Sequence, residues 1–231
     1  MILSNEKSTG ESMLKKPVIF VNFKTYMQVS SDAALRLAKH CAWVAEKTGV
    51  LIVVIPQAVD LRHIVESVDV PIFAQHVDPD TSGACTGAQV IESLKSAGVC
   101  GSLLNHVEKQ VSYTVIKQTL AHAKALKFKM VVCASNYQEV RGLALLRPDY
   151  IAVEPPDLIG GKISVSLANP DLLKNCVGIV GKNCLVVGAG IHTARDVKVA
   201  FELGACGVLV SSGIVLAKNQ KKALLNLVSK I

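Results

Sequence analysis

One stretch of the chain reads Tyr150-Ile-Ala-Val-Glu-Pro-Pro-Asp-Leu-Ile-Gly160, in which an apolar run leads directly into a carboxylate and two prolines. Pro155 and Pro156 lack the amide N–H that strand pairing requires, so the predicted strand must stop at Glu154. A carboxylate at a strand end, on a stiff proline shoulder, is a candidate general base. It can act as one only if the rest of the chain builds a site around it.

On both sides of this stretch, apolar β-branched runs alternate with helical patterns, which predicts eight strands that are each followed by a helix. The strands are short and apolar throughout, as expected when both of their faces are buried. The expected strands span residues 17–23, 50–55, 71–75, 99–104, 129–134, 150–153, 184–187 and 207–210.

Eight parallel strands can close into a barrel that has no free edge. We therefore predict an α/β fold, a closed eight-stranded parallel (β/α)8 barrel of the TIM type. The same elements could form an open doubly wound sheet, but no Gly-x-Gly-x-x-Gly follows the first strand. No linker-like run splits the chain, so we expect residues 17–231 to form a single domain, preceded by a loose tail over residues 1–16.

Composition limits the kinds of molecule that the chain is expected to bind. The net charge of +7 favours anionic partners, but the lysines are scattered without an interleaved aromatic stripe, so no nucleic-acid partner is expected. The polar start lacks the apolar stretch of a signal peptide, and no run approaches the ~20 apolar residues of a membrane span, so no membrane partner is expected. Seven cysteines without a Cys-x-x-Cys pair favour reduced, buried thiols and a cytoplasmic location.

In a barrel of this kind, chemistry collects at the carboxyl ends of the strands. The predicted strand ends bring Lys24, His106 and Glu154 to one rim. Each residue has an ordinary explanation when taken alone: Lys24 as a solvated loop lysine, His106 as a helix cap, and Glu154 as the partner of a surface lysine. Three such residues at the strand ends of one barrel indicate a shared site.

Small residues follow the last two strands, in Gly188-Ala-Gly190 and Ser211-Ser-Gly213. Small residues let the backbone approach a ligand closely and offer its N–H groups to an anion, so these loops are a candidate phosphate cradle. Tight turns without a ligand would leave the same pattern. A metal site is not expected, because His76 and Asp78 have no evident third ligand, and their expected role is to order a loop of the rim.

Five motifs in chain order resemble the triosephosphate isomerase family, and most closely its short archaeal branch. They are Asn22-Phe-Lys-Thr-Tyr26, Ala74-Gln-His-Val-Asp78, Asn105-His-Val-Glu108, Val153-Glu-Pro-Pro-Asp-Leu-Ile-Gly160 and Gly188-Ala-Gly-Ile191. The resemblance covers the chain from Pro17 onward. It implies an isomerase that interconverts dihydroxyacetone phosphate and D-glyceraldehyde 3-phosphate through an enediolate, in glycolysis and gluconeogenesis. It also implies that no metal or organic cofactor is used, and that the chain forms a homodimer or homotetramer.

By this resemblance, Glu154 is the general base and His106 is the electrophile that polarises the carbonyl; a neutral imidazole in this role is already known for this enzyme family. Lys24 is the cation that steadies the developing negative charge, and Glu108 holds Lys24 in place. The implied substrate-binding residues are Asn22, Ile159, Gly160, Gly190, Ser211 and Ser212. Ile159 and Gly160 belong to a lid whose closure would exclude water.

Two positions depart from the family pattern. Val107 stands where the family has a serine, and Lys162 replaces a glycine of the lid. These departures leave open a second reading, a binding protein of the same fold with weakened catalysis. A third reading is another barrel that acts on sugar phosphates, such as a synthase or an aldolase that forms a Schiff base through a lysine. We expect isomerase activity to survive, because Lys24, His106, Glu154 and Gly160 are all present.

Overall fold

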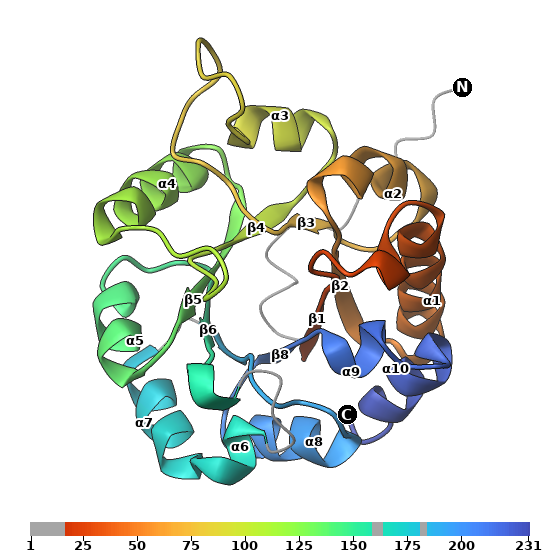
Figure 1. The fold of residues 1–231 in the computed structure, drawn as a ribbon. Helices are drawn as coiled ribbons and strands as arrows, with labels where there is room; N and C mark the ends of the chain where they lie inside the picture. The colour runs from red at the N-terminus through yellow and green to blue at the C-terminus, as the bar shows by residue number, and fades with distance from the viewer. Residues whose placement is uncertain (1–16, 159–163, 181–183) are drawn as a thin grey trace.

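The computed structural model describes residues 17–158, 164–180 and 184–231, so the predicted tail over residues 1–16 lies outside the described part of the chain. Its strands all pair in parallel and follow the order β2-β1-β8-β7-β6-β5-β4-β3 (Figure 1). The two ends of this order meet at a bridge between Val54 and Ile72, where the N–H of Val54 donates to the Pro71 carbonyl at 3.0 Å. The predicted closed barrel is confirmed, and the open doubly wound sheet is excluded.

The strands are β1 Val18–Asn22, β2 Leu51–Ile55, β3 Phe73–Ala74, β4 Gly101–Leu104, β5 Lys129–Ala134, β6 Tyr150–Val153, β7 Cys184–Val187 and β8 Gly207–Val210. The helices are α1 Asp32–Thr48, α2 Leu61–Ser67, α3 Ile91–Ser96, α4 Tyr113–Ala125, α5 Tyr137–Ala144, α6 Val165–Ala168, α7 Pro170–Val180, α8 Ala194–Glu202, α9 Ser212–Val215 and α10 Gln220–Val228. The third strand is shorter than predicted, because only Phe73 and Ala74 pair with β4. The short helices α6 and α9 were not predicted.

Strand side chains alternate between two apolar cores. In β1, Val18 and Phe20 point into the barrel, whereas Ile19 and Val21 face the surrounding helices. The ring of Phe20 meets that of Tyr150 edge to face inside the barrel, with centroids 5.2 Å apart. Because both faces of each strand are buried, the strands read as continuous apolar runs and not as alternating ones.

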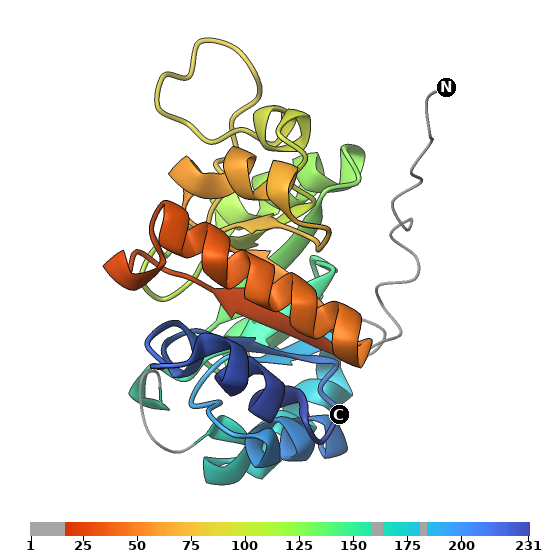
Figure 2. The same cartoon turned by 90° about the vertical axis from the view of Figure 1, so that its right-hand side faces the viewer.

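The first and last helices, α1 and α10, pack side by side and complete the ring of helices around the barrel (Figures 1 and 2). The ammonium of Lys221 on α10 lies 3.3 Å from the ring centroid of Trp43 on α1, a cation–π contact across this joint. Among the described residues, none of the helices has both the length and the apolar character of a membrane span.

The cysteines only partly follow the expectation of reduced, buried thiols. Cys41, Cys133 and Cys176 are buried free thiols, and Cys85 and Cys100 are free but more exposed. Cys206 is disulfide-bonded, so the prediction of a thiol is wrong there. Spacing gave no signal for this bond, because no Cys-x-x-Cys pair is present.

Candidate active site

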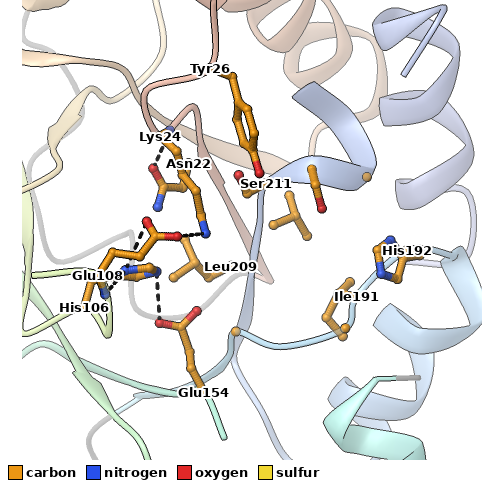
Figure 3. Close-up of a pocket in the computed structure, with 15 residues that line it drawn as sticks. Asn22, Lys24, Tyr26, His106, Glu108, Glu154, Ile191, His192, Leu209 and Ser211 are labelled. Atoms are coloured by element: carbon orange, nitrogen blue, oxygen red, sulfur yellow. Dashed lines mark hydrogen bonds and ion pairs between the residues drawn. The ribbon is translucent and has the colours of Figure 1, made fainter. Parts of the chain in front are cut away.

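A cavity of about 260 Å³ opens at the carboxyl end of the barrel, among loops that follow β1, β4, β6, β7 and β8 (Figure 3). Its wall contains the three residues predicted to carry the chemistry, Lys24, His106 and Glu154. It also contains four of the predicted substrate-binding residues, Asn22, Gly190, Ser211 and Ser212. The other two, Ile159 and Gly160, lie outside the described residues.

Glu154 is placed by the end of β6. Its N–H donates to the Ala134 carbonyl at 2.8 Å, which is the last contact that extends the pairing of β6 with β5. The residue is only 4 % exposed. Burial raises the pKa of this carboxyl to about 7, although a hydrogen bond from the Cys133 thiol and the charge of Lys24 act in the opposite direction. Glu154 is therefore a carboxyl that titrates near neutral pH, as a general base requires.

One oxygen of Glu154 is buried without a hydrogen bond among the described residues. This atom, Oε2, lies 3.5 Å from Nε2 of His106, and the contact does not have hydrogen-bond geometry. Figure 3 shows the carboxylate pointing from below toward the imidazole, at the edge of the cavity. A buried carboxylate oxygen without a partner is costly to maintain and is available to a ligand that enters the cavity.

Gly188 makes room for this carboxylate. A Cβ atom built on Gly188 would lie 2.3 Å from Cγ and 2.6 Å from Oε1 of Glu154. Any other residue would displace the carboxylate, so the glycine is required by close approach and not by backbone conformation. The sequence singled out Gly188 as a possible anion contact and missed this role, because the clash involves a residue from another strand.

His106 is set in place by the residue before it. Asn105 adopts the left-handed conformation, with φ of 61°, and its side chain donates to the Cys133 carbonyl at 3.0 Å and accepts from the N–H of Val111 at 3.1 Å. His106 does not cap the following helix, because Ser112 caps α4 by accepting from the N–H of Val115 at 3.3 Å. The interpretation of His106 as a helix cap is therefore wrong.

The hydrogen bonds of His106 define its tautomer. Its Nδ1 accepts from the N–H of Glu108 at 3.2 Å, so Nδ1 carries no proton and Nε2–H faces Glu154. Burial lowers the pKa of this imidazole, the charge of Glu108 raises it, and the charge of Lys24 lowers it further, with a net downward shift. The site therefore holds a neutral imidazole that can donate a hydrogen bond from Nε2.

Lys24 sits on a strained backbone just beyond β1, with φ of 49°. The conformation is held from two sides: the N–H of Lys24 donates to Oδ1 of Asn22 at 2.9 Å, and Nε2 of Gln75 donates to the Lys24 carbonyl at 2.9 Å. Its Nζ lies 2.6 Å from Oε1 of Glu108, and its side chain is 17 % exposed. Lys24 is thus a positioned cation and not a solvated loop lysine.

The loops after β7 and β8 line the cavity with backbone and small side chains. Gly190 has φ of 69°, which favours glycine. The hydroxyl of Ser211 is buried and has no hydrogen-bond partner among the described residues. Ser212 and Gly213 open α9, and the first N–H groups of a helix have no partner within it. These groups can all be offered to an anion.

His76 and Asp78 form a clamp at the base of the loop before α3. The imidazole Nε2 lies 3.1 Å from Oδ1 of Asp78, whose other oxygen accepts from the N–H of Gln89 at 2.8 Å. The loop-ordering role predicted for this pair is confirmed. Over the described ranges of the chain, no group of three His, Cys, Asp or Glu side chains could hold a metal ion.

Comparison with known proteins agrees with this geometry. The model of the triosephosphate isomerase family matches residues 17–230. Proteins named triosephosphate isomerase from Methanothermus fervidus and Methanobrevibacter smithii are 43 % and 42 % identical to the chain, over 94 % of its length and 100 % of theirs. The protein of that name from Methanocaldococcus jannaschii is 43 % identical over 93 % of this chain and 100 % of its own. With the barrel and the rim residues in place, the chain belongs to the triosephosphate isomerase family.

Proposed function

We propose that this chain interconverts dihydroxyacetone phosphate and D-glyceraldehyde 3-phosphate, with Glu154, His106 and Lys24 as its catalytic residues. One observation carries the assignment of roles. The Glu154 carboxyl, with a pKa of about 7, lies beside the protonated Nε2 of a neutral imidazole in a cavity that also contains the Lys24 ammonium.

Each group has one task in the proposed reaction. Glu154 removes a proton from the carbon next to the substrate carbonyl and returns it to the neighbouring carbon. The Nε2–H of His106 donates a hydrogen bond to the carbonyl oxygen and then helps to move the hydroxyl proton. The ammonium of Lys24 steadies the negative charge that develops on the enediolate. Only protons move in this sequence, so side chains can carry it out without an electron acceptor.

The phosphate would bind on the opposite side of the cavity. We assign its contacts to Gly190, Ser211 and Ser212, supported by the unpartnered Ser211 hydroxyl and the open N–H groups at the start of α9. Asn22 contacts the substrate beside Lys24. Ile159 and Gly160 remain predicted phosphate contacts on the basis of the resemblance alone.

Of the two departures from the family pattern, the one that falls on a described residue does not change this proposal. Val107 follows His106 and is half-buried. The imidazole accepts its hydrogen bond from the backbone N–H of Glu108, so this bond does not depend on the side chain at position 107. Lys162 lies outside the described residues. The Lys24–Glu108 ion pair also counts against an aldolase, because it engages the lysine nitrogen that would have to attack a carbonyl to form a Schiff base.

A coupled assay on the pure protein tests the proposal. We expect conversion of each triose phosphate into the other, with no labelling of the protein when borohydride is added together with substrate. No turnover, together with ligand binding detected by calorimetry, would favour the binding protein. Covalent labelling after borohydride would favour the aldolase.

We further propose that the chain works in the cytoplasm as a homodimer or homotetramer, and that residues 17–231 form one domain. The loop between β3 and α3 stands out from the body of the barrel in both views, and it exposes residues that a second copy could cover (Figures 1 and 2). Light scattering of the purified protein across a concentration series tests the assembly. A mass of 24.6 kDa at all concentrations would rule it out.

A further inference from the structure

A buried carboxylate lies behind the candidate phosphate cradle, outside the cavity. Asp196, in the first turn of α8, is 6 % exposed and accepts four hydrogen bonds. Its Oδ2 accepts from the N–H of His192 at 3.1 Å, and from the N–H and hydroxyl of Thr193 at 2.8 and 2.9 Å. Its Oδ1 accepts from the hydroxyl of Ser164 at 3.2 Å, which belongs to a different part of the chain.

Helix capping accounts for only half of this network. Thr193 and Asp196 form a capping box at the start of α8, in which Oδ2 accepts from the N–H of Thr193 and the Thr193 hydroxyl accepts from the N–H of Asp196. The contacts at Oδ1 add nothing to the cap. There the hydroxyl of Ser164 meets Asp196 and lies 2.9 Å from the hydroxyl of Ser166, which also donates to the Asp196 carbonyl at 3.4 Å. Both serines are 1 % exposed.

The network joins the start of α6 to the loop that lines the candidate phosphate side of the cavity. Ser164 and Ser166 lie at the start of α6, which packs against α8 (Figure 1). His192 and Thr193 end the loop between β7 and α8, and that loop lines the cavity with Gly188, Gly190 and His192. Asp196 therefore holds the far end of the loop whose N–H groups are the candidate anion contacts.

The charge on Asp196 makes these bonds strong. Burial alone would raise its pKa, but the hydrogen bonds from His192, Thr193 and Ser164 outweigh burial and lower the pKa. The carboxylate is thus ionised at neutral pH, and charge-assisted hydrogen bonds are shorter and stronger than neutral ones. A buried polar network that is satisfied in this way specifies one geometry, whereas apolar packing of α6 on α8 would stabilise without fixing the loop.

We propose that Asp196 is a positioning residue: through Ser164 it ties the start of α6 to the β7–α8 loop, and so fixes the loop in the geometry that receives the substrate phosphate. Asp196 touches neither substrate nor the reacting atoms. The proposal rests on the proposed function, because it assumes that this loop grips a phosphate.

Two single substitutions distinguish the Ser164–Asp196 bond from the capping box of α8. Ser164→Ala removes the bond to Oδ1 and leaves the capping box intact, whereas Thr193→Ala removes the cap hydroxyl and leaves Ser164 in place. We expect Ser164→Ala to raise KM about fivefold, and to raise the Kd of inorganic phosphate by a similar factor, with kcat within about twofold of the parent. Thr193→Ala also removes the hydroxyl bond to Oδ2 but keeps the two backbone N–H bonds from the loop, so it should lower Tm by about 2–4 °C and raise KM less than Ser164→Ala does.

Ser164→Thr is the conservative control, because it restores a hydroxyl at the same position and should return KM and the phosphate Kd toward the parent values. Unchanged KM and phosphate Kd in Ser164→Ala, whatever happens to Tm, would overturn the positioning role. The phosphate Kd is measured by calorimetry and does not depend on turnover. If the parent chain binds phosphate but does not isomerise triose phosphates, the proposed function fails, while the comparison of phosphate Kd values still decides the role of Asp196.

Discussion

The mouth of the barrel handles charge by two different means. The region after β1, β4 and β6 uses the ionisable side chains Lys24, His106 and Glu154, and burial shifts the pKa of His106 down and that of Glu154 up. The region after β7 and β8 uses backbone N–H groups, a buried hydroxyl and glycines. The first region should therefore be damaged by removal of a charge, and the second by added volume. We expect the first kind of damage to appear in kcat and the second in KM.

The largest expected effect comes from Glu154→Gln, which removes the base and keeps the shape. We expect kcat to fall by about 10²–10⁴-fold, with the Kd of inorganic phosphate within about threefold of the parent. A stopped or coupled assay gives kcat, and calorimetry gives the Kd of phosphate. Parent-like turnover in this variant would remove Glu154 from the mechanism.

The same variant should be more stable at alkaline pH. Because the pKa of Glu154 is raised to about 7 in the folded state, its contribution to stability is fully present below the unfolded-state pKa of 4.5 and is lost as the pH rises to about 7. Glu154→Gln avoids this loss, so its free energy of unfolding at pH 8 should exceed that of the parent by about 1–3 kcal/mol. Denaturant unfolding at pH 5 and pH 8 tests the sign, and the gain should be smaller at pH 5.

The pH profile of the parent is the next test. A general base with a pKa of about 7 must be ionised to act, so kcat/KM should fall about tenfold per pH unit below 7 and reach about 1 % of its plateau at pH 5. Initial rates in constant-ionic-strength buffers would show this limb. A plateau that extends down to pH 5 would contradict the raised pKa of Glu154.

Gly188→Ala tests the contact between the two regions. The new Cβ would overlap the Glu154 carboxylate, so we expect kcat to fall about 10–100-fold and Tm to fall as well. In a Glu154→Ala background the same change should cost much less stability, because the overlapping atoms are gone.

Gly178→Ala on α7 is the matched control. Its Cβ meets nothing within 4 Å, and alanine favours a helix, so it should leave activity unchanged. Equal effects of Gly188→Ala in both backgrounds would argue against the clash.

The smallest expected effect is that of Glu108→Gln. The Glu108 side chain is 56 % exposed, so its ion pair with Lys24 contributes little to stability. The negative charge of Glu108 raises the pKa of Glu154, so its removal should move the acidic limb of kcat/KM to slightly lower pH. We also expect kcat to fall about tenfold, because Lys24 loses the partner that holds its ammonium over the cavity. Unfolding curves that match those of the parent, together with a lower kcat, would show that the ion pair positions Lys24 and does not stabilise the fold.

The sequence was sufficient where local chemistry decides the structure. Pro155 lacks an N–H, so β6 ends where predicted, and the apolar runs 184–187 and 207–210 are the strands β7 and β8. The rim residues followed, because in a parallel barrel every strand ends on the same side. Three features could not be predicted: the close approach of Gly188 to Glu154, the left-handed backbone of Asn105 and the bond between Ser164 and Asp196. Each depends on contacts between segments far apart in the chain, which no local pattern reports.

The joint between β2 and β3 has a consequence for local opening of the barrel. In the described part of the chain, this joint has a single bridge, whereas β1 and β2 share five register pairs. Amide hydrogen exchange should therefore be faster at Val54, whose N–H crosses the joint, than at the amides that pair β2 with β1. Gln75 comes just after β3 and bonds the carbonyl of Lys24, so a transient opening there would release the backbone of the ammonium-bearing residue first. Local opening between β2 and β3 would therefore disturb the placement of Lys24 well before the apolar interior of the barrel is exposed.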